Sequence, residues 1–498
     1  MANHLFDRLF ERGRADAPVL ITDARTFAYA ELERETARWA NALVTLDVRP
    51  GDRIAAQVEK SAANLILYLA TIRAGAVFLP LNPAYTANEM AHFIADAEPA
   101  LVVCDPAARK ALATVAGAAR IEILNGAGKG SLADLAAAAS DRFETVAREP
   151  ADLAAICYTS GTTGRSKGAM LAHGNLVSNA QTLGELWRFT ARDVLIHALP
   201  IYHVHGLFVA SNVLLMAGGS MIFQARFDAG DVLSAMSRAT SLMGVPTFYT
   251  RLLEHPGLTR EATAGMRLFI CGSAPLLAHT HQAFEQRTDH VILERYGMTE
   301  TGMNTSNPYD GERIAGTVGL PLPGVCVRVR DAETGEAAPG EIGMVEVKGP
   351  NVFAGYWRDP ENTAETFRPD GFFVTGDLGV IDARGYLSIV GRGKDLIISG
   401  GLNVYPKEIE LELDALPGVV ESAVIGLPHA DLGEAVTAVV AVGDKTELSE
   451  QGILDALAPR LARFKQPRRV IFVAELPRNA MGKVQKAYLR GQHQGLYS

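Results

Sequence analysis

Short apolar runs alternate with longer segments of helical periodicity from the start of the chain to about residue 390. Runs typical of strands occupy residues 53–58, 100–104, 266–271 and 291–294. Buried strands separated by helices build mostly parallel sheets, because two parallel strands need a crossover connection between them. The pattern therefore predicts layered α/β sheets for most of the chain.

The pattern changes after Gly371. Residues 372–377, 380–385 and 386–390 favour a β-meander with tight Asp/Gly turns. A glycine-flanked charged junction follows, and beyond it lies an α+β stretch of about a hundred residues, the size of a small domain. We predict an N-terminal domain over 1–391, a hinge at 392–395 and a C-terminal domain over 396–498.

Composition narrows the class of protein. The chain has 498 residues, of which 48% are apolar and 21% charged, as in ordinary globular proteins. Its net charge of −9 argues against nucleic-acid binding. The uncharged segment 206–223 is interrupted by Gly218 and Gly219, which favours a buried helix and strand over a membrane span. The N-terminus lacks a signal-peptide core and the four cysteines are scattered, so we expect a cytoplasmic protein without membrane or nucleic-acid partners.

A turn rich in Gly, Ser and Thr follows the apolar run 153–157 and ends at Lys167. Backbone N–H groups, hydroxyls and an ammonium suit the phosphates of a nucleotide. The turn is not a Walker A loop, because Ser166 stands five residues after Gly161 and Gly168 follows Lys167. For this turn alone, a polar hairpin with an unrelated lysine is the alternative.

Four other features carry charged groups next to predicted strands or turns. Glu300 follows a strand and a glycine turn, which suits Mg²⁺ bound to phosphates. Asp377 suits ribose hydroxyls, Arg392 adds a cation, and Lys483 lies on a turn near the C-terminus. Each has a structural alternative: Glu300 alone could balance a helix dipole, and Lys483 alone could be a surface lysine.

The end of the chain is strongly basic. Nine arginines and lysines between residues 460 and 490 are opposed within that stretch by Glu475. This asymmetry favours a small polyanionic ligand, with a solvated surface as the alternative.

Together and in this order, the motifs resemble the ANL superfamily of adenylate-forming enzymes, over nearly the whole chain from Tyr29 to Lys486. Lys486 departs from the family, in which many members have arginine, but it keeps the charge. The resemblance implies a large N-terminal domain of layered α/β sheets with a β-rich subdomain, and a small mobile α+β C-terminal domain. It also implies an acid–thiol ligase that uses ATP, Mg²⁺ and coenzyme A.

The resemblance assigns roles to residues. The β- and γ-phosphates would be held by Thr159, Ser160, Gly161, Thr162, Thr163, Gly164 and Lys167. Other ATP contacts would come from Gly272, Ser273, Ala274, Glu294, Arg295, Tyr296, Gly297, Thr299, Asp377 and Arg392. Glu300 would orient Mg²⁺, and Lys483 would bridge the attacking carboxylate and the α-phosphate.

In the family the small domain then rotates, about a hinge that matches Lys394. Lys483 leaves the site and a face around Gly400 and Gly401 replaces it. Coenzyme A would bind there, with Arg463 and Lys465, and its thiol would enter near His203. We also expect a lysine acetyltransferase that acts on Lys483 as a partner.

The acyl pocket implied by the resemblance includes His203, Val204, His205, Arg251, Ser273, Arg295 and Met303. Two histidines two residues apart, with no acid or cysteine nearby, make a poor zinc site. Burying an unpaired guanidinium costs several kcal/mol, so two arginines favour a substrate with a second carboxylate. The alternative is that they bond to backbone carbonyls or to Glu294.

The segments 244–251, 294–301 and 304–308 resemble the malonyl-CoA synthetase branch, which makes malonyl-CoA from malonate, ATP and CoA through a malonyl-adenylate and often accepts methylmalonate. That branch commonly has threonine where this chain has Val204. A CoA ligase for another short-chain or aromatic acid is the alternative. A module that loads a carrier protein is disfavoured, because no carrier motif follows residue 490.

Overall fold

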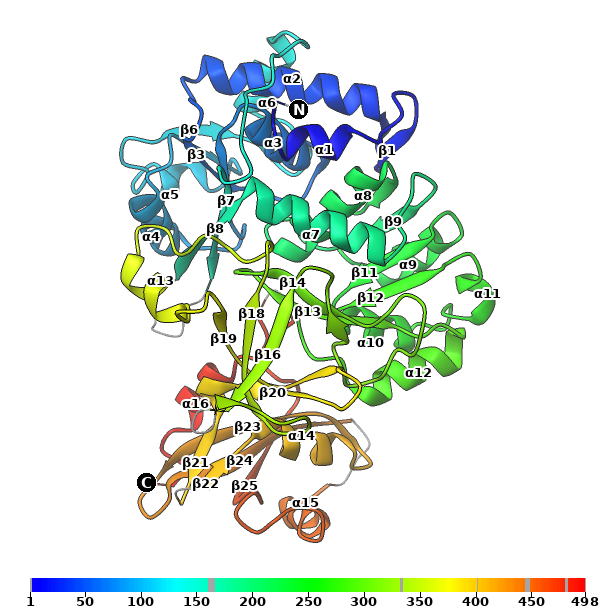
Figure 1. Cartoon of the computed structure of the whole chain (residues 1–498), viewed down its shortest axis with the longest axis vertical. Coiled ribbons are helices and arrows are strands. Elements are labelled where there is room, and N and C mark those ends of the chain that lie inside the picture. The colour runs from blue at the N-terminus through cyan, green and yellow to red at the C-terminus, as the bar shows by residue number, and fades with distance from the viewer. Residues whose placement is uncertain are drawn as a thin grey trace. The chain divides into compact units, whose positions relative to one another are not determined.

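The computed structural model describes residues 2–159, 166–331, 335–400, 402–443, 448–479 and 482–497. The chain forms two compact units (Figure 1). Unit 1 consists of Met1–Cys326 and Val347–Phe373, and unit 2 of Val327–Glu346 and Val374–Ser498. The predicted α/β fold with a large N-terminal and a small C-terminal domain is confirmed. The contacts place the β-rich segment before residue 391 in unit 2, and the boundary at 391 and the hinge stay predictions.

Six strands in the described part of unit 1 form one sheet, in the order β6-β5-β3-β4-β7-β8. Its strands are parallel except β8, which runs antiparallel to β7. The strands are β3 Arg53–Gln57, β4 Val77–Pro80, β5 Leu101–Cys104, β6 Arg120–Ile123, β7 Leu153–Thr159 and β8 Lys167–Ala172. The intervening helices are α3 Ala62–Arg73, α4 Ala87–Ala97, α5 Arg109–Leu112 and α6 Ser131–Ala138.

The second sheet of unit 1 has the order β15-β14-β13-β12-β11-β9-β10-β1-β2 in the described residues. Strands from β13 to β1 are parallel, and β2, β14 and β15 are antiparallel additions at the edges. The strands are β1 Pro18–Ile21, β2 Thr26–Ala28, β9 Val194–His197, β10 Ser220–Phe223, β11 Ser241–Gly244, β12 Leu268–Cys271, β13 Leu293–Met298, β14 Gly302–Ser306 and β15 Leu320–Pro321.

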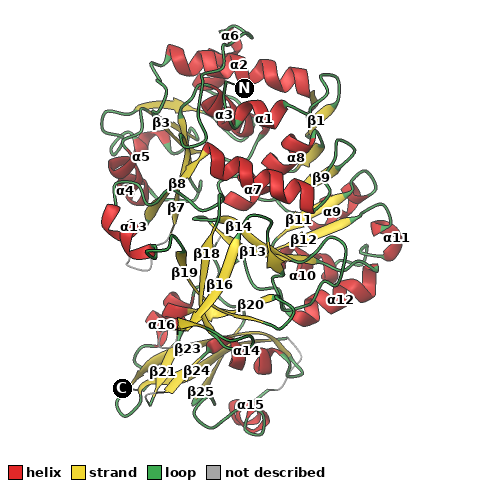
Figure 2. Ribbon diagram, viewed as in Figure 1, coloured by secondary structure: helices red, strands yellow, loops and turns green. Residues whose placement is uncertain are grey.

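Helices surround the second sheet and connect it to the first. They are α1 Phe6–Phe10, α2 Tyr29–Thr45, α7 His173–Leu186, the π-helix η1 His205–Ser211, α8 Asn212–Ala217, α9 Ala229–Met236, α10 Pro246–Glu254, α11 Arg260–Thr263, α12 Ala278–Thr288 and α13 Pro360–Thr366. Helix α7 contacts both β8 and β14, so it lies between the two sheets (Figure 1). Helices α9 to α12 pack together beside β11 (Figure 2).

Unit 2 contains two sheets in its described residues. The first has the order β17-β16-β18-β19-β20, with strands β16 Cys326–Asp331, β17 Gly335–Glu336, β18 Gly343–Lys348, β19 Phe373–Ile381 and β20 Leu387–Arg392. The short 3₁₀ turn η2 Gly393–Asp395 follows. The second sheet consists of β21 Ile397–Ser399, β22 Leu402–Val404, β23 Val419–His429, β24 Gly433–Val442 and β25 Arg469–Val473. The helices of unit 2 are α14 Pro406–Asp414, α15 Glu450–Leu457 and α16 Lys486–His493.

The second sheet of unit 2 buries both faces, because side chains alternate along its strands. Val424 and Val440 pack with α14 and α15, whereas Ala423 and Val439 pack with Leu489 of α16. This alternation gives unit 2 a core of its own.

The prediction for the uncharged segment was right, and one strand prediction was wrong. The segment 206–223 is helix followed by strand, as predicted. The predicted second strand of the meander, 380–385, is wrong: β19 continues past Asp377 to Ile381, and residues 382–385 form the turn to β20. Pairing of residues 377–381 with the antiparallel strand β20 extends β19 beyond its predicted end. No helix in the described residues is long and apolar enough to span a bilayer.

Candidate functional site

The polar turn that follows β7 lies between two antiparallel strands. Thr159, the last residue of β7, pairs with Lys167, the first residue of β8. The predicted phosphate residues Ser160, Gly161, Thr162, Thr163 and Gly164 lie outside the described residues. The hairpin foreseen as the alternative is therefore present, and no helix follows the turn directly, because α7 begins only at His173.

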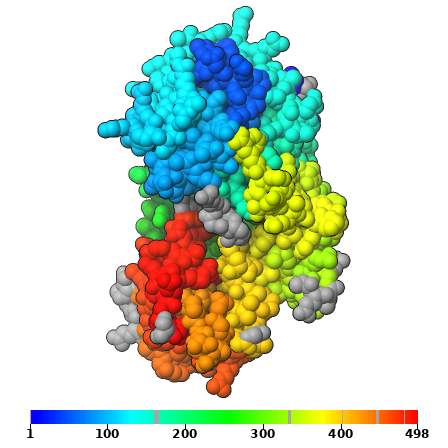
Figure 3. Space-filling model, turned by 90° about the vertical axis from the view of Figure 1, so that its left-hand side faces the viewer, coloured from blue at the N-terminus to red at the C-terminus, as the bar shows by residue number. Residues whose placement is uncertain are grey.

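The lysine at the base of this hairpin is held from a distant part of the chain. Lys167 Nζ donates to Asn362 Oδ1, and it lies 5.3 Å from the centre of the Tyr356 ring. Asn362 in turn donates to Asp359 Oδ2 at 2.7 Å. Helix α13, which carries Asn362, lies at the surface of unit 1 (yellow in Figure 3) and has no buried residue. Lys167 is thus positioned by specific contacts.

An extended segment before α13 fixes where Tyr356 lies. Backbone hydrogen bonds of 2.7–3.1 Å join residues 354–357 to residues 168–170 of β8. This pairing covers the edge of the sheet and sets the register of the segment. It brings the Tyr356 hydroxyl to 3.1 Å from Glu300 Oε1, to which it donates. Tyr356 therefore contacts both predicted charged groups of the phosphate site.

Glu300 is 6% exposed and accepts from the Thr159 hydroxyl at 3.4 Å as well as from Tyr356. Burial, and then the Glu300 charge, raises the pKa of the neighbouring Cys157 thiol to about 12. The described residues contain no group of three acids, histidines or cysteines that could hold a metal. Mg²⁺ in nucleotide sites takes one or two carboxylates and fills its other positions with phosphates and water. Glu300 beside a threonine hydroxyl fits that requirement.

Arg295, in β13, is a buried cation that has no acidic partner among the described residues. Arg295 is only 2% exposed, and its Nε and Nη2 have no hydrogen-bond partner among the described residues. A Cβ on Gly272 would lie 2.7 Å from Arg295 Cζ, so the guanidinium packs against bare backbone that only glycine provides. Burial lowers the pKa of Arg295 to about 10. Bonding to Glu294 or to carbonyls, the predicted alternative, does not satisfy these two nitrogens.

His205 lies beside Arg295 and points an unused nitrogen into the same region. Its Nδ1 lies 3.1 Å from the Ser273 hydroxyl, and its Nε2 has no partner in the described part of the chain. Burial, and then the Arg295 charge, lowers the pKa of His205 well below its ordinary value, so the ring is neutral. Ser273 has a φ of +72°, a strained conformation for a residue other than glycine. Strain of this kind is typical of functional positions.

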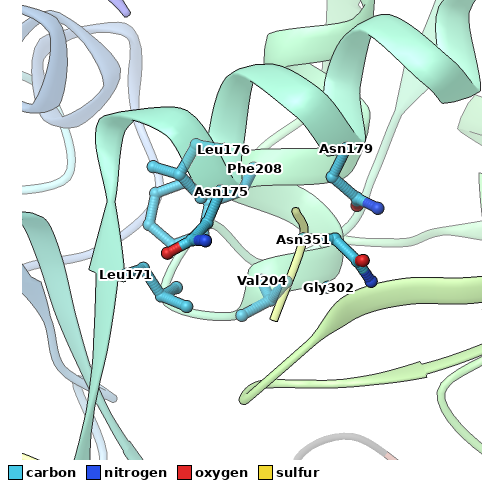
Figure 4. Close-up of a pocket in the computed structure, with 8 residues that line it drawn as sticks. All are labelled: Leu171, Asn175, Leu176, Asn179, Val204, Phe208, Gly302 and Asn351. Carbon is cyan, nitrogen blue, oxygen red and sulfur yellow. The ribbon is translucent and has the colours of Figure 1, made fainter. Parts of the chain in front are cut away.

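Val204 separates two small cavities in unit 1. One, of about 10 Å³, lies under α7, where Val204 faces Asn175, Asn179 and Gly302 (Figure 4). The other, of about 30 Å³, is lined by His203 and Val204 together with Tyr85, Tyr158, Tyr202, Cys157 and Thr299, among others. Each has room for about one water molecule. The predicted wall residue Val204 thus lies between His203 and the α7 helix.

The remaining predicted acyl residues differ in exposure. Met303 is 2% exposed, and Asn179 holds its backbone through hydrogen bonds of 2.9 and 3.0 Å. Arg251 lies on the exposed face of α10, whose residues Tyr249 and Leu252 are buried. Of the two predicted arginines, only Arg295 is therefore buried.

The predicted adenine residues lie at the ends of β12 and in β13. Ala274 follows β12, and Tyr296 and Gly297 continue β13 beyond the buried Glu294. A Cβ on Gly297 would lie 2.0 Å from the Gly302 carbonyl oxygen, which explains the glycine there. Thr299 lines the cavity beside His203.

Unit 2 brings the two predicted ribose residues together. Arg392 Nε lies 2.6 Å from Asp377 Oδ1, across the β19–β20 pairing. Lys483 is exposed on a turn in which its backbone N–H donates to Asn479 Oδ1 at 3.0 Å. The predicted hinge residue Lys394 is exposed in η2, and Gly400 is exposed with a φ of +59°. Gly401 lies outside the described residues.

The basic tail is not an unopposed patch in the folded chain. Six of its cations pair with acids from other elements of unit 2: Arg460 with Glu412, Lys465 with Glu408, Arg469 with Glu450, Arg478 with Glu421, Lys486 with Glu410 and Arg490 with Asp395. Acids distant in sequence neutralise much of the charge. Arg463 and Arg468 are exposed and have no ion pair in the described part of unit 2.

Three groups of functional interest were not predicted: Tyr356, Asn362 with Asp359, and the buried pair Lys60 and His197. Their contacts join segments 56 to 195 residues apart, to which local patterns give no guide. The one local signal was the Asp359-Pro360 pair, which is typical of a helix start.

Comparisons with known proteins agree with this geometry. Residues 6–357 match the family model "AMP-binding enzyme", and residues 408–483 match "AMP-binding enzyme C-terminal domain". The crystal structure of ATP-bound MatB from Rhodopseudomonas palustris is 60% identical, with a TM-score of 0.98 and 100% of both chains covered. A feruloyl-CoA synthase from Amycolatopsis is 37% identical over 93% of both chains. A malonate–CoA ligase from Arabidopsis thaliana is 35% identical over 88% of this chain and 78% of its own length.

These matches cover both units, and they agree with a nucleotide turn, a buried carboxylate beside it and a lysine near the C-terminus. Enzymes of this family use ATP, Mg²⁺ and coenzyme A. The chain therefore belongs to the AMP-binding enzyme family, as an AMP-forming acyl-CoA ligase of the ANL superfamily.

Proposed function

We propose that this ligase is a malonyl-CoA synthetase, which converts malonate, ATP and CoA to malonyl-CoA, AMP and diphosphate. One malonate carboxylate attacks the α-phosphorus of ATP and diphosphate leaves. The thiolate of CoA then attacks the acyl carbon of the malonyl-adenylate, and AMP leaves. Methylmalonate is a second expected substrate.

The observation that carries this proposal is the buried guanidinium of Arg295, with two nitrogens unsatisfied among the described residues. Leaving a charge in such a site is strongly unfavourable unless a ligand pairs with it. A distal carboxylate offers charge-assisted hydrogen bonds to both nitrogens. His205 Nε2 and the Ser273 hydroxyl supply neutral polar groups nearby. An apolar monoacid would leave the two Arg295 nitrogens and His205 Nε2 unpaired.

Relatives support the choice of acid. The Arabidopsis relative acts on malonate, and the MatB structure holds ATP. The feruloyl-CoA synthase acts on an aromatic monoacid, so family membership alone does not select the substrate. Arg295 favours malonate over ferulate, because a feruloyl chain has no second carboxylate to pair with it.

Roles follow for the other residues. Thr159, Lys167 and the turn between them would hold the β- and γ-phosphates, and Glu300 would hold Mg²⁺, which neutralises phosphate charge when bound. Asp377 and Arg392 would hold the ribose. Lys483 would stabilise the charge that develops as the carboxylate attacks the α-phosphate.

Turnover would require the C-terminal domain to rotate about Lys394 within the hinge 392–395. Gly400 and Gly401, with Arg463 and Lys465, would then form the CoA site. Of the two cations, Arg463 is the stronger candidate, since Lys465 is 2.6 Å from Glu408.

Lys483 is also the proposed target of a lysine acetyltransferase. Acetylation removes the ammonium charge, and the exposed turn makes the side chain accessible. Acetylated protein should lose adenylation and keep thioester formation from supplied malonyl-AMP. Full ATP-dependent activity after complete acetylation of Lys483 would overturn this role.

A diphosphate-release screen tests the proposed function. The acids are malonate, methylmalonate, succinate, sulfoacetate, acetate, butyrate, coumarate and isovalerate, each with ATP, Mg²⁺ and CoA. Isovalerate replaces the distal carboxylate of malonate with an isopropyl group of the same shape. We expect the highest kcat/KM with malonate, and malonyl-CoA as the product by mass spectrometry. A higher kcat/KM for a monoacid would favour the alternative, a ligase for short-chain or aromatic acids.

A further inference from the structure

A lysine with no acidic partner among the described residues is buried between the two sheets of unit 1. Lys60, in the loop between β3 and α3, is 7% exposed. Its Nζ lies 3.0 Å from His197 Nδ1 and 2.6 Å from the His197 carbonyl oxygen. The ring of Phe223 lies 4.3 Å away. Burial lowers the pKa of Lys60 well below its ordinary value. Keeping a lysine there is unfavourable, which calls for a function.

The contacts of His197, at the end of β9, define its tautomer. Nε2 lies 2.9 Å from the Gly206 carbonyl oxygen, which can only accept, so Nε2 carries a proton. Nδ1 then accepts from Lys60. A doubly protonated ring would direct an N–H at the Lys60 nitrogen, and burial and the Lys60 charge lower the pKa of His197 well below its ordinary value. The chain of donors therefore runs from Lys60 through His197 to Gly206.

That chain ends next to the acyl site. Gly206 is the second residue of η1, and His205, the first, is the residue that faces Arg295 and Ser273. Ser211, at the end of η1, donates to the same Gly206 carbonyl at 3.0 Å. A Cβ on Gly206 would lie 2.0 Å from the Pro200 carbonyl oxygen, so the backbone has no freedom to shift in that direction.

We propose that Lys60 and His197 are positioning residues that hold η1, and with it His205, where a distal carboxylate of the acid is recognised. Lys60 comes from one sheet and His197 from the other, so the pair sets the position of η1 relative to both. This inference rests on the proposed function, because it names what the pair contributes to the choice of a dianionic acid. The inference assigns part of the specificity for the acid to residues that lie behind those lining the pocket.

The decisive variant is Lys60→Met, which keeps an unbranched chain and removes the charge and the donors. Displacement of a site group by about 1 Å can cost about a hundredfold in rate. We expect the ratio of kcat/KM for malonate to that for isovalerate to fall by that factor, and KM for ATP to stay at the wild-type value. A general loss of stability would lower kcat/KM equally for the two acids.

Ser211→Ala is the milder second variant, since it removes one hydroxyl that donates to the Gly206 carbonyl and lies 3.1 Å from His197 Nε2. It should lower the same ratio by a smaller factor, and it decides the matter if Lys60→Met does not fold. Tyr29→Phe is the matched control: it removes a buried hydroxyl that donates to the Gly219 carbonyl at 2.9 Å, away from the acyl site, and should leave the ratio unchanged.

The outcomes separate the two proposals. A wild-type protein that prefers a monoacid would refute the proposed function. A wild-type protein that prefers malonate, combined with folded variants whose acid ratio is unchanged, would refute the positioning role alone. A fall in the ratio for Lys60→Met and Ser211→Ala but not for Tyr29→Phe supports it.

Discussion

Replacing Arg295 with methionine removes the buried guanidinium and keeps an unbranched apolar side chain. In the ligand-free protein, a pKa of about 10 in place of the ordinary 12.5 means that folding disfavours the charged form by about 3 kcal/mol. Arg295→Met removes this unfavourable term. We therefore expect the ligand-free variant to melt a few degrees above the wild type, although the substitution lies in a catalytic pocket.

Malonate should respond in the opposite direction. A distal carboxylate that pairs with Arg295 relieves the same 3 kcal/mol or so, and the variant cannot recover it, which corresponds to about a hundredfold in kcat/KM. Isovalerate has no distal charge, so its kcat/KM should be unchanged or higher. Diphosphate release with the two acids measures the ratio, and thermal melting with and without malonate measures the stabilisation by ligand.

Arg287→Met is the matched control, because this arginine has its partners within the protein. Its guanidinium donates to the carbonyls of Leu253, His255 and Leu258 at 2.7–3.1 Å. Removing it should lower the melting temperature and leave the acid ratio unchanged. Malonate kinetics in Arg295→Met that equal those of the wild type would refute the pairing. A melting temperature of ligand-free Arg295→Met below that of the wild type would refute the conclusion that burial of this charge is unfavourable.

Three further predictions concern other parts of the chain. Lys483→Ala should lower malonate-dependent diphosphate release by about a hundred- to a thousandfold and spare malonyl-CoA formation from supplied malonyl-AMP; loss of both steps would contradict its role. Tyr356→Phe loses the hydrogen bond to Glu300 but keeps the ring beside Lys167, so it should lower the adenylation rate about tenfold. Tyr356→Leu should lower the rate further. Equal adenylation rates in Tyr356→Phe and wild type would exclude a role for the hydroxyl. Burial raises the pKa of Asp414 to about 6, so its charged form destabilises unit 2 as pH rises through 6. Asp414→Asn should therefore melt at a higher temperature than the wild type at pH 8 but not at pH 4. A difference in melting temperature that persists at pH 4 would rule out the Asp414 charge as the cause.

Local patterns were sufficient to predict several strands of unit 1, among them β3, β5, β12 and β13. The apolar run 153–157 is β7, and Cys157 at its end is buried. Patterns of this kind report periodicity and turn chemistry within a few residues. The extension of β19 past Asp377 was missed because it depends on pairing with β20, and not on the local sequence.

Contacts between distant segments could not be predicted. Tyr356 reaches Glu300 only because residues 354–357 pair with the edge of β8, almost two hundred residues away in sequence. The tail looked unopposed because the acids that pair with it, among them Glu408 and Glu450, lie before it in the chain. Net charge along a segment does not tell which charges remain unpaired after folding.

Cations that stay unpaired after folding are a better guide to the ligand than the segment that contains the most cations. On unit 2, exposed cations of the tail pair with acids, and such surface pairs contribute little energy in either direction. In unit 1, Arg295 and Lys60 are buried without an acid among the described residues, where each charge is costly. Both lead to His205, Arg295 directly and Lys60 through His197 and Gly206. The proposed dianionic acid would offset the cost at Arg295, whereas an acid whose one carboxylate is engaged in the reaction would leave it in place.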